Sequence, residues 1–257
     1  MHRSQGPGPA ILATALWLGG WLRGEVGVDD LIEALHRSAP DAPPVLRDGA
    51  GSTPLTELLR RVRADEVDRT WLLLPRPGRI QGWPRDISGA PGPAILLTSA
   101  GRAVGLLRLE ASGWRLDGVS DSPVGVLEAE GLSARAGARA FAALIADGAS
   151  RLELLGLDRA ADGEAPTGWG RALHPAPPGL DPATRDLLSR ITTVRDALDL
   201  ALADDGAAVT SAEARARGDV LANLAGQLED LLCALVAGLR SELQATPPSP
   251  SVPLHAR

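Results

Sequence analysis

Three arginines and one tryptophan in a single loop carry the clearest chemical signal in the chain. Arg76, Arg79 and Arg85 follow a short apolar run, and Trp83 lies among them. Guanidinium groups bind anions through paired hydrogen bonds, and indole rings stack on planar groups and cations. Because loops at strand ends often carry binding sites, residues 75–93 are the best candidate site, for an anionic or aromatic ligand. The alternative is a solvated proline-rich connection whose Trp83 caps the core.

Other residues whose side chains could take part in catalysis lack the neighbouring groups that catalysis needs. His174 has an ordinary pKa near neutrality and is a candidate base or ligand contact, but no serine or cysteine motif accompanies it. The alternative for His174 is a histidine on a linker. Cys233 lies in an apolar helical run, which indicates core filling. With four histidines and one cysteine in the chain, we expect no metal site, no cofactor and no catalytic residue, and we lean against an enzyme.

A long stripe of leucines near the C-terminus predicts a helix with a broad apolar surface. Thr210 and Glu213 have the spacing of a capping box at its start. The apolar arc over residues 211–243 is wider than one partner helix needs, so it packs either on the body of the chain or on a second subunit. The candidate interface residues for a homodimer or a protein partner are Leu228, Leu232, Leu235 and Leu239.

The rest of the sequence predicts an α+β fold. A mostly antiparallel sheet, in which a half-buried meander is the clearest part, packs with helices, and an antiparallel α-helical hairpin follows. Helices are expected at 10–22, from Asp29 or Asp30 to before Pro40, and from Thr53-Pro54 to Val62. Another is expected at Ser133–Asp147, where small residues allow docking on the sheet, and the two hairpin helices start from Asp181 and Thr210. Strands are expected at 70–74 in a central position, at 94–98, 102–110 and 114–119 with three-residue turns, and at 124–129 and 151–157.

Composition limits the classes of function. Of the 257 residues 44% are hydrophobic and 23% are charged, as in a domain that buries a core. A net charge of −6, with no basic cluster, argues against nucleic acid as a partner. One cysteine indicates a reducing compartment, so we expect the cytoplasm. The apolar run at 10–22 is shorter than the roughly 20 residues of a membrane span, so it predicts a packed amphipathic helix.

Several short segments resemble an uncharacterised actinobacterial protein family. The first is Asp204-Asp205-Gly206-Ala207-Ala208-Val209-Thr210-Ser211-Ala212-Glu213-Ala214. The second is Trp71-Leu72-Leu73-Leu74-Pro75-Arg76-Pro77-Gly78, and a shorter match is His174-Pro175-Ala176. Arg79 stands where that family tends to have an acidic residue. The resemblance covers most of the chain and implies no known activity, ligand or cofactor.

These observations give one preferred function and one alternative. We expect a cytosolic, non-enzymatic interaction or scaffold protein that uses its helical hairpin for association. The alternative is a small-molecule binding module or enzyme with a pocket at the 75–93 loop. The predicted divisions of the chain are a flexible leader (1–9), an α+β body (10–160), a Gly/Pro-rich linker (161–180), the hairpin (181–244) and a disordered tail (245–257).

Overall fold

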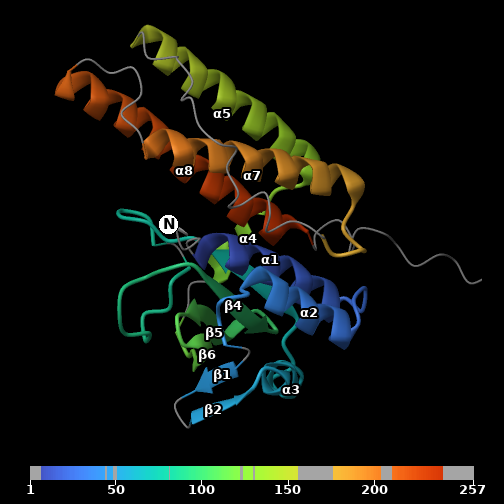
Figure 1. Ribbon diagram of the computed structural model, residues 1–257. Coiled ribbons are helices and arrows are strands. Elements are labelled where there is room, and N and C mark those ends of the chain that lie inside the picture. Colours follow the sequence, from blue (N-terminus) through green and yellow to red (C-terminus); the bar gives the residue numbers. More distant parts are fainter. Residues whose placement is uncertain are drawn as a thin grey trace, which may run out of the picture.

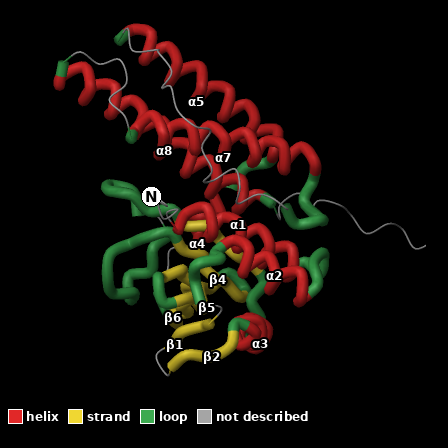
Figure 2. Tube along the Cα trace, viewed as in Figure 1, coloured by secondary structure: helices red, strands yellow, loops and turns green. Residues whose placement is uncertain are grey.

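The computed structural model describes residues 7–43, 45–48, 51–80, 82–121, 124–129, 131–155, 176–203 and 210–239. Within these ranges the protein is α+β, which confirms the predicted class. A six-stranded mixed sheet with four helices forms one unit, called the sheet unit, and three long helices form a second, called the helix unit (Figures 1 and 2).

The sheet has the order β2-β1-β6-β5-β4-β3, and every neighbouring pair is antiparallel except β1 and β6. The strands are β1 (Val45–Asp48), β2 (Gly51–Pro54), β3 (Arg69–Leu73), β4 (Ala94–Ser99), β5 (Arg102–Glu110) and β6 (Gly113–Gly118). Strands β4, β5 and β6 are the predicted meander. Their turns contain two residues instead of the predicted three, since Ser99 pairs with Arg102 and Glu110 pairs with Gly113.

The hairpin of β1 and β2 was not predicted. Its second strand is Gly51-Ser52-Thr53-Pro54, which lies mostly exposed at the edge of the sheet and shows no apolar alternation. The expected helix start at Thr53-Pro54 is therefore wrong. Helix α3 (Thr56–Ala64) begins later, with Leu55 as its N-cap residue.

Strands β3 and β4 are buried on both faces. Leu72, Ile95 and Leu97 belong to a large core shared with the helices, and alternate residues such as Trp71 and Leu96 belong to a second, smaller core. The expected central position of the strand at 70–74 is wrong, because β3 is the last strand of the sheet. Helices α1 and α8 pack against β3, so its continuous apolar run is buried despite its edge position.

Helix α1 (Pro7–Leu22) is buried around its circumference. It packs against α2 (Val28–Ser38) and against strands β3, β4 and β5. Leu12 and Leu18, which point in different directions around the helix, are both essentially inaccessible to solvent. The expected amphipathic character is wrong, because α1 is apolar on all sides. Helices of this kind are enclosed within a core.

Two predicted strands are helical. Residues 124–129 form helix α4 (Val124–Ala129), and 151–154 are the last residues of helix α5 (Ala134–Leu154). The expected end of the helix before Gly148 is wrong, because that glycine serves close packing: a Cβ there would lie 2.8 Å from Leu224 Cδ2. The expected docking of this helix on the sheet is also wrong, since α5 packs on α8 and α7.

The predicted C-terminal hairpin is present as α7 (Pro182–Leu202) and α8 (Ser211–Gly238). Asp181 caps α7, and both bonds of the predicted capping box of Thr210 and Glu213 are formed. The Arg195 side chain donates to Glu229, and Arg217 donates to the Ala201 carbonyl oxygen, so the two helices run antiparallel. Helix α8 ends at Gly238, before the predicted end at residue 243.

A glycine at the end of α8 makes a test of the packing between this helix and the segment that precedes α5. A Cβ on Gly238 would lie 1.9 Å from the Leu132 carbonyl oxygen. We expect Gly238→Ala to lower the free energy of unfolding by about 1–3 kcal/mol, as overpacking does. Gly218 lies in the same helix and has nothing within 4 Å of such an atom. As the control, Gly218→Ala should raise stability by about 0.5–1 kcal/mol. Urea unfolding measures the free energy of unfolding of both variants. Equal changes in the two would contradict the close packing of Gly238 against Leu132.

Candidate functional site

The loop predicted to bind a ligand joins the sheet unit to the helix unit. Arg76 Nη1 and Nη2 donate to Asp230 Oδ1 and Oδ2 at 2.7 and 2.6 Å. Arg76 Nη1 also donates to the Gly226 carbonyl oxygen at 2.5 Å. Arg79 Nε lies 3.0 Å from Asp230 Oδ1, so two arginines of the loop share one carboxylate of α8. We call Arg76, Arg79, Gly226 and Asp230 the clamp.

Local backbone geometry places both arginines on the same carboxylate. Arg76 and Arg79 exchange backbone hydrogen bonds of 3.0 and 2.9 Å across Pro77-Gly78. Gly78 has a φ of +79°, the left-handed conformation that the third position of a type II turn requires. On the helix side, a Cβ at position 226 would lie 2.8 Å from Arg76 Nε. A glycine there lets the guanidinium lie directly against the backbone of α8.

The clamp stabilises the charged form of Arg76. Its hydrogen bond with Asp230 raises the pKa of Arg76 above the ordinary value, and this effect outweighs the opposing effect of burial. Both side chains of the bidentate pair are about three-quarters buried, so solvent screens the pair only in part. The arrangement is a charged contact between two segments that are 154 residues apart in the chain.

The other predicted ligand residues lie elsewhere. Trp83 is buried in the second core, as the alternative interpretation of the loop expects. Arg85 is exposed, and its backbone N–H donates to the Asp121 carbonyl oxygen. His174 lies outside the described residues. The structure therefore brings Arg76 and Arg79 together on Asp230 and does not group Trp83 with them, and ligand binding at this loop stays a prediction.

The leucines predicted to form an interface pack inside the chain. Leu228 and Leu232 have no exposed surface, and Leu235 is 1% exposed. Leu239 is half-buried at the edge of the large core. Leu235 lies against Gly137 of α5, where a Cβ would come within 2.5 Å of Leu235 Cδ2. Of the two explanations for the broad apolar arc, packing on the chain's own elements accounts for these four side chains.

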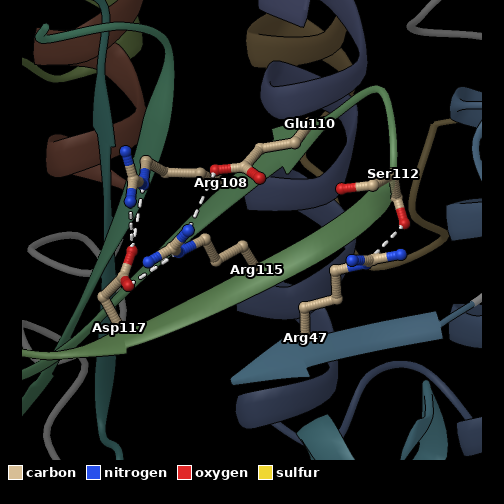
Figure 3. A network of polar contacts seen from close by, with 6 residues as sticks. All are labelled: Arg47, Arg108, Glu110, Ser112, Arg115 and Asp117. Carbon is tan, nitrogen blue, oxygen red and sulfur yellow. Dashed lines mark hydrogen bonds and ion pairs between the residues drawn. The ribbon is translucent and has the colours of Figure 1, made fainter. Parts of the chain in front are cut away.

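A set of arginines that crosses three strands was missed by sequence reasoning. Arg115 on β6 pairs in register with Arg108 on β5 and with Arg47 on β1, so the three side chains share one face of the sheet (Figure 3). Glu110 and Asp117 lie on the same face. We call these five residues the arginine face. The alternation of Leu107 and Leu109 with Arg108 and Glu110 indicated an outward face. Arg47 could not be added to that face without the unpredicted strand β1.

Most charges of the arginine face are neutralised within it. Asp117 Oδ2 accepts from Arg108 Nε and Nη2 at 3.1 and 2.5 Å, and its Oδ1 accepts from Arg115 Nε at 2.8 Å. Burial alone would raise the pKa of Asp117, but the hydrogen bonds from Arg115 and Arg108 outweigh it, and the pKa is lowered. Arg115 Nη1 lies 3.8 Å from Glu110 Oε1. Three guanidinium groups against two carboxylates leave one net positive charge.

Arg47 differs from the other two arginines in its partner. Its Nε donates to the backbone carbonyl oxygen of Ser112 at 3.1 Å, as Figure 3 shows, and the side chain is exposed. A neutral carbonyl leaves the positive charge of the guanidinium uncompensated, whereas the carboxylate of Asp117 compensates that of Arg108. The surplus charge of the arginine face therefore lies at its Arg47 side.

Two further features of the described residues bear on function. No group of three or more His, Cys, Asp or Glu side chains in these ranges is placed to hold a metal ion. Helix α8 is long and apolar enough to cross a membrane by length and composition, but half of its apolar window is buried within the protein. The core helices of proteins that do not span a membrane meet the same criterion of length and composition.

The fold and the clamp define a two-part α+β protein in which a helix unit packs against the edge of a mixed sheet. Two separate family models, one for each part of the chain, match the sequence. An Rv1486c-like protein N-terminal domain model matches residues 12–114, and an Rv1486c-like protein C-terminal domain model matches residues 129–230. The chain therefore belongs to the Rv1486c-like family, whose descriptions name no activity. No curated protein and no solved structure matches it.

The clamp predicts a measurable coupling between the two units. We expect Arg76→Ala and Asp230→Ala each to lower the free energy of unfolding, and the double variant to lower it by less than the sum. The coupling energy should be about 1–2 kcal/mol, since the pair is bidentate but partly exposed. Arg85→Ala, which removes an exposed guanidinium of the same loop, is the control and should change stability by less than about 0.5 kcal/mol. Additive effects in urea unfolding would show that the pair does not hold the units together.

Proposed function

We propose that the protein is a non-enzymatic, cytoplasmic interaction protein that binds an acidic segment of a partner through the arginine face. The observation that carries this proposal is the in-register row of Arg108, Arg115 and Arg47 across three neighbouring strands. The single cysteine supports a reducing compartment.

The residue types and their exposure support a carboxylate-bearing partner. Arg115 and Arg47 are exposed, and like charges placed opposite each other on a sheet are unfavourable unless anions compensate them. Glu110 and Asp117 already supply two anions, and one more carboxylate beside Arg47 would complete the balance. Guanidinium groups bind carboxylates with paired hydrogen bonds, so an aspartate or glutamate of a partner fits this position.

The alternative of a ligand pocket at residues 75–93 has weaker support from the geometry. Arg76 and Arg79 bond Asp230, and Trp83 is buried, so a ligand there would have to displace contacts that join the two units. The arginine face requires no such displacement. For that reason it is the surface on which the proposed function rests.

Binding of an acidic probe tests the arginine face. A fluorescein-labelled peptide with several glutamates should bind the protein at low salt with an affinity that falls as salt rises. Arg47→Ala should weaken binding about five- to tenfold, which corresponds to about 1–1.4 kcal/mol for a hydrogen-bonded charge contact. Arg102→Ala removes an exposed arginine from the end of β5 and should leave the affinity unchanged. Fluorescence anisotropy measures the affinities. Equal binding by the two variants would refute the proposal, and stronger binding of heparin than of the peptide would assign the face to polyanions in general.

Self-association through residues 211–243 requires a different test, because three of its four candidate leucines, Leu228, Leu232 and Leu235, are buried. We expect Leu235→Asp to abolish cooperative unfolding, since a charge at a position 1% exposed costs several kcal/mol. Leu202→Asp, at a helix-unit leucine that is 40% exposed, is the control and should leave the protein folded. Light scattering combined with thermal circular dichroism measures mass and folding together. A Leu235→Asp protein that stays folded while its mass falls from two chains to one would instead identify the hairpin as the interface.

A further inference from the structure

The edge strand β2 extends the arginine face by one more residue. Arg47 on β1 pairs in register with Ser52 on β2, so the row of three arginines that crosses β5, β6 and β1 continues to Ser52. Ser52 is exposed, and β2 lies at the end of the sheet that is far from the helix unit (Figure 1). In the part of the chain that the structure describes, no strand pairs with the outer side of β2. The edge of the sheet therefore lies beside the surplus charge of Arg47.

The carbonyl directions of β1 show which backbone groups of β2 face outward. The Leu46 carbonyl oxygen accepts a hydrogen bond from Thr53 Oγ1, so it points toward β2. The Val45 carbonyl oxygen would lie 2.9 Å from a Cβ on Gly113, so it points toward β6. Along an antiparallel pair, residues that face the partner strand alternate with residues that face away. Thr53 is opposite Leu46 and faces β1, so the next residue, Ser52, directs its N–H and C=O away from β1.

A strand added at this edge would bring a side chain close to Arg47. The residue opposite Ser52 would lie on the same face as Arg47 and about 10 Å from it, which is two strand spacings. Ser52 is small, so a glutamate on the added strand can reach over it toward the guanidinium. Arg47 bonds the neutral carbonyl of Ser112, and a carboxylate is a stronger acceptor for a guanidinium. The position opposite Ser52 therefore suits an acidic residue.

We propose that an extended acidic segment of a partner protein adds to β2 as a seventh, antiparallel strand, with a glutamate opposite Ser52. This glutamate and Ser52 exchange both main-chain hydrogen bonds, which supplies affinity, and the contact with Arg47 selects an acid. Pro54 has no N–H to donate, so the pairing is centred on Ser52. Strand addition rests on the proposed function and specifies how the acidic segment binds.

A second copy of this chain fits the same edge less well. Pairing of β2 with its own copy around Ser52 would place serine opposite serine and would supply no carboxylate to Arg47. It would also join two arginine faces, each with a surplus positive charge, in one continuous sheet, and like charges that are close on a sheet are unfavourable. Charge complementarity therefore favours an acidic segment as the occupant.

N-methylation of an acidic peptide tests strand addition on the unaltered protein. The probe is a fluorescein-labelled peptide of four Glu-Thr repeats, whose carboxylates share one face when it is extended. Methylation of the glutamate nitrogens removes the N–H groups that face β2, and methylation of the threonine nitrogens removes those that face away. We expect about a tenfold loss of affinity or more with the first and less than about a twofold loss with the second, measured by fluorescence anisotropy. Equal affinities of the two methylated peptides, or a loss confined to the second, would overturn strand addition.

Two substitutions at one position localise the binding to the edge. Ser52→Pro removes the outward N–H and keeps Arg47, and proline is tolerated in edge strands where the N–H faces solvent. It should weaken binding of the unmethylated peptide about tenfold, whereas Ser52→Ala keeps the N–H and should change the affinity less than about twofold. Equal binding by the two variants would count against the edge as the site and overturn strand addition.

The result for Arg47→Ala separates strand addition from the proposed function. If Arg47→Ala weakens binding but the two methylated peptides bind equally, the arginine face binds an acid in another way and strand addition is wrong. If Arg47→Ala binds like the unaltered protein, the proposed function is wrong and strand addition fails with it. A free protein that is a dimer by light scattering and a monomer as Ser52→Pro would assign the edge to a second copy and would also overturn strand addition.

Discussion

The carboxylate of Asp230 is the contact on which the placement of the two units depends. It accepts hydrogen bonds from Arg76 and lies within ion-pair distance of Arg79, at the point where α8 passes the sheet. A bidentate guanidinium pair fixes orientation as well as distance, because both N–H groups must point at both oxygens. Gly226, one turn earlier in α8, admits the guanidinium against the helix backbone. The clamp therefore joins one defined point of α8 to the loop that follows β3.

The apolar part of this junction explains why α8 is so rich in leucine. Its residues contact α5 and α7 on one side and β3 on another, so more than one stripe of the helix must be apolar. Helix α1 solves a similar problem in the sheet unit, where it is surrounded by α2 and three strands. Both helices are apolar over a wide arc because each is enclosed by several elements, and the large core runs continuously through both units. A broad apolar arc on a helix can therefore reflect several packed neighbours within the same chain, and it does not by itself indicate a second subunit.

The sequence was informative where a local signal determines the structure. Capping residues such as Asp181 and Thr210 located the starts of α7 and α8. The alternation of leucines with Arg108 and Glu110 located the outer face of the meander. It was misleading where tertiary packing determines the outcome. Gly148 was interpreted as a helix end because glycine commonly ends helices, yet here it makes room for Leu224.

The candidate sites show the same contrast between local sequence signals and tertiary packing. The clamp combines Arg76 with Asp230, and nothing local in the sequence relates two residues 154 positions apart. The arginine face combines Arg108 and Arg115, which alternation suggested, with Arg47 from a strand too short and polar to predict. The pairing of Gly105 with Gly118 likewise depends on the register of two strands. In each case the residue types were visible in the sequence, but the partner was fixed by register or by helix packing.

A chain whose basic residues are all arginines makes residue type a poor guide to function, and the surroundings of each guanidinium become decisive. Arg195 is largely buried between Glu229 and Asp199, and burial, which alone would lower its pKa, is outweighed by the bond to Glu229 and by the attraction of Asp199. Arg76 is likewise held by a carboxylate, so both stabilise contacts between helices or units. Arg47 has the same side chain but is exposed and bonds a neutral carbonyl. An arginine is available for recognition where its charge is left uncompensated at the surface, and in the described sheet Arg47 meets that condition.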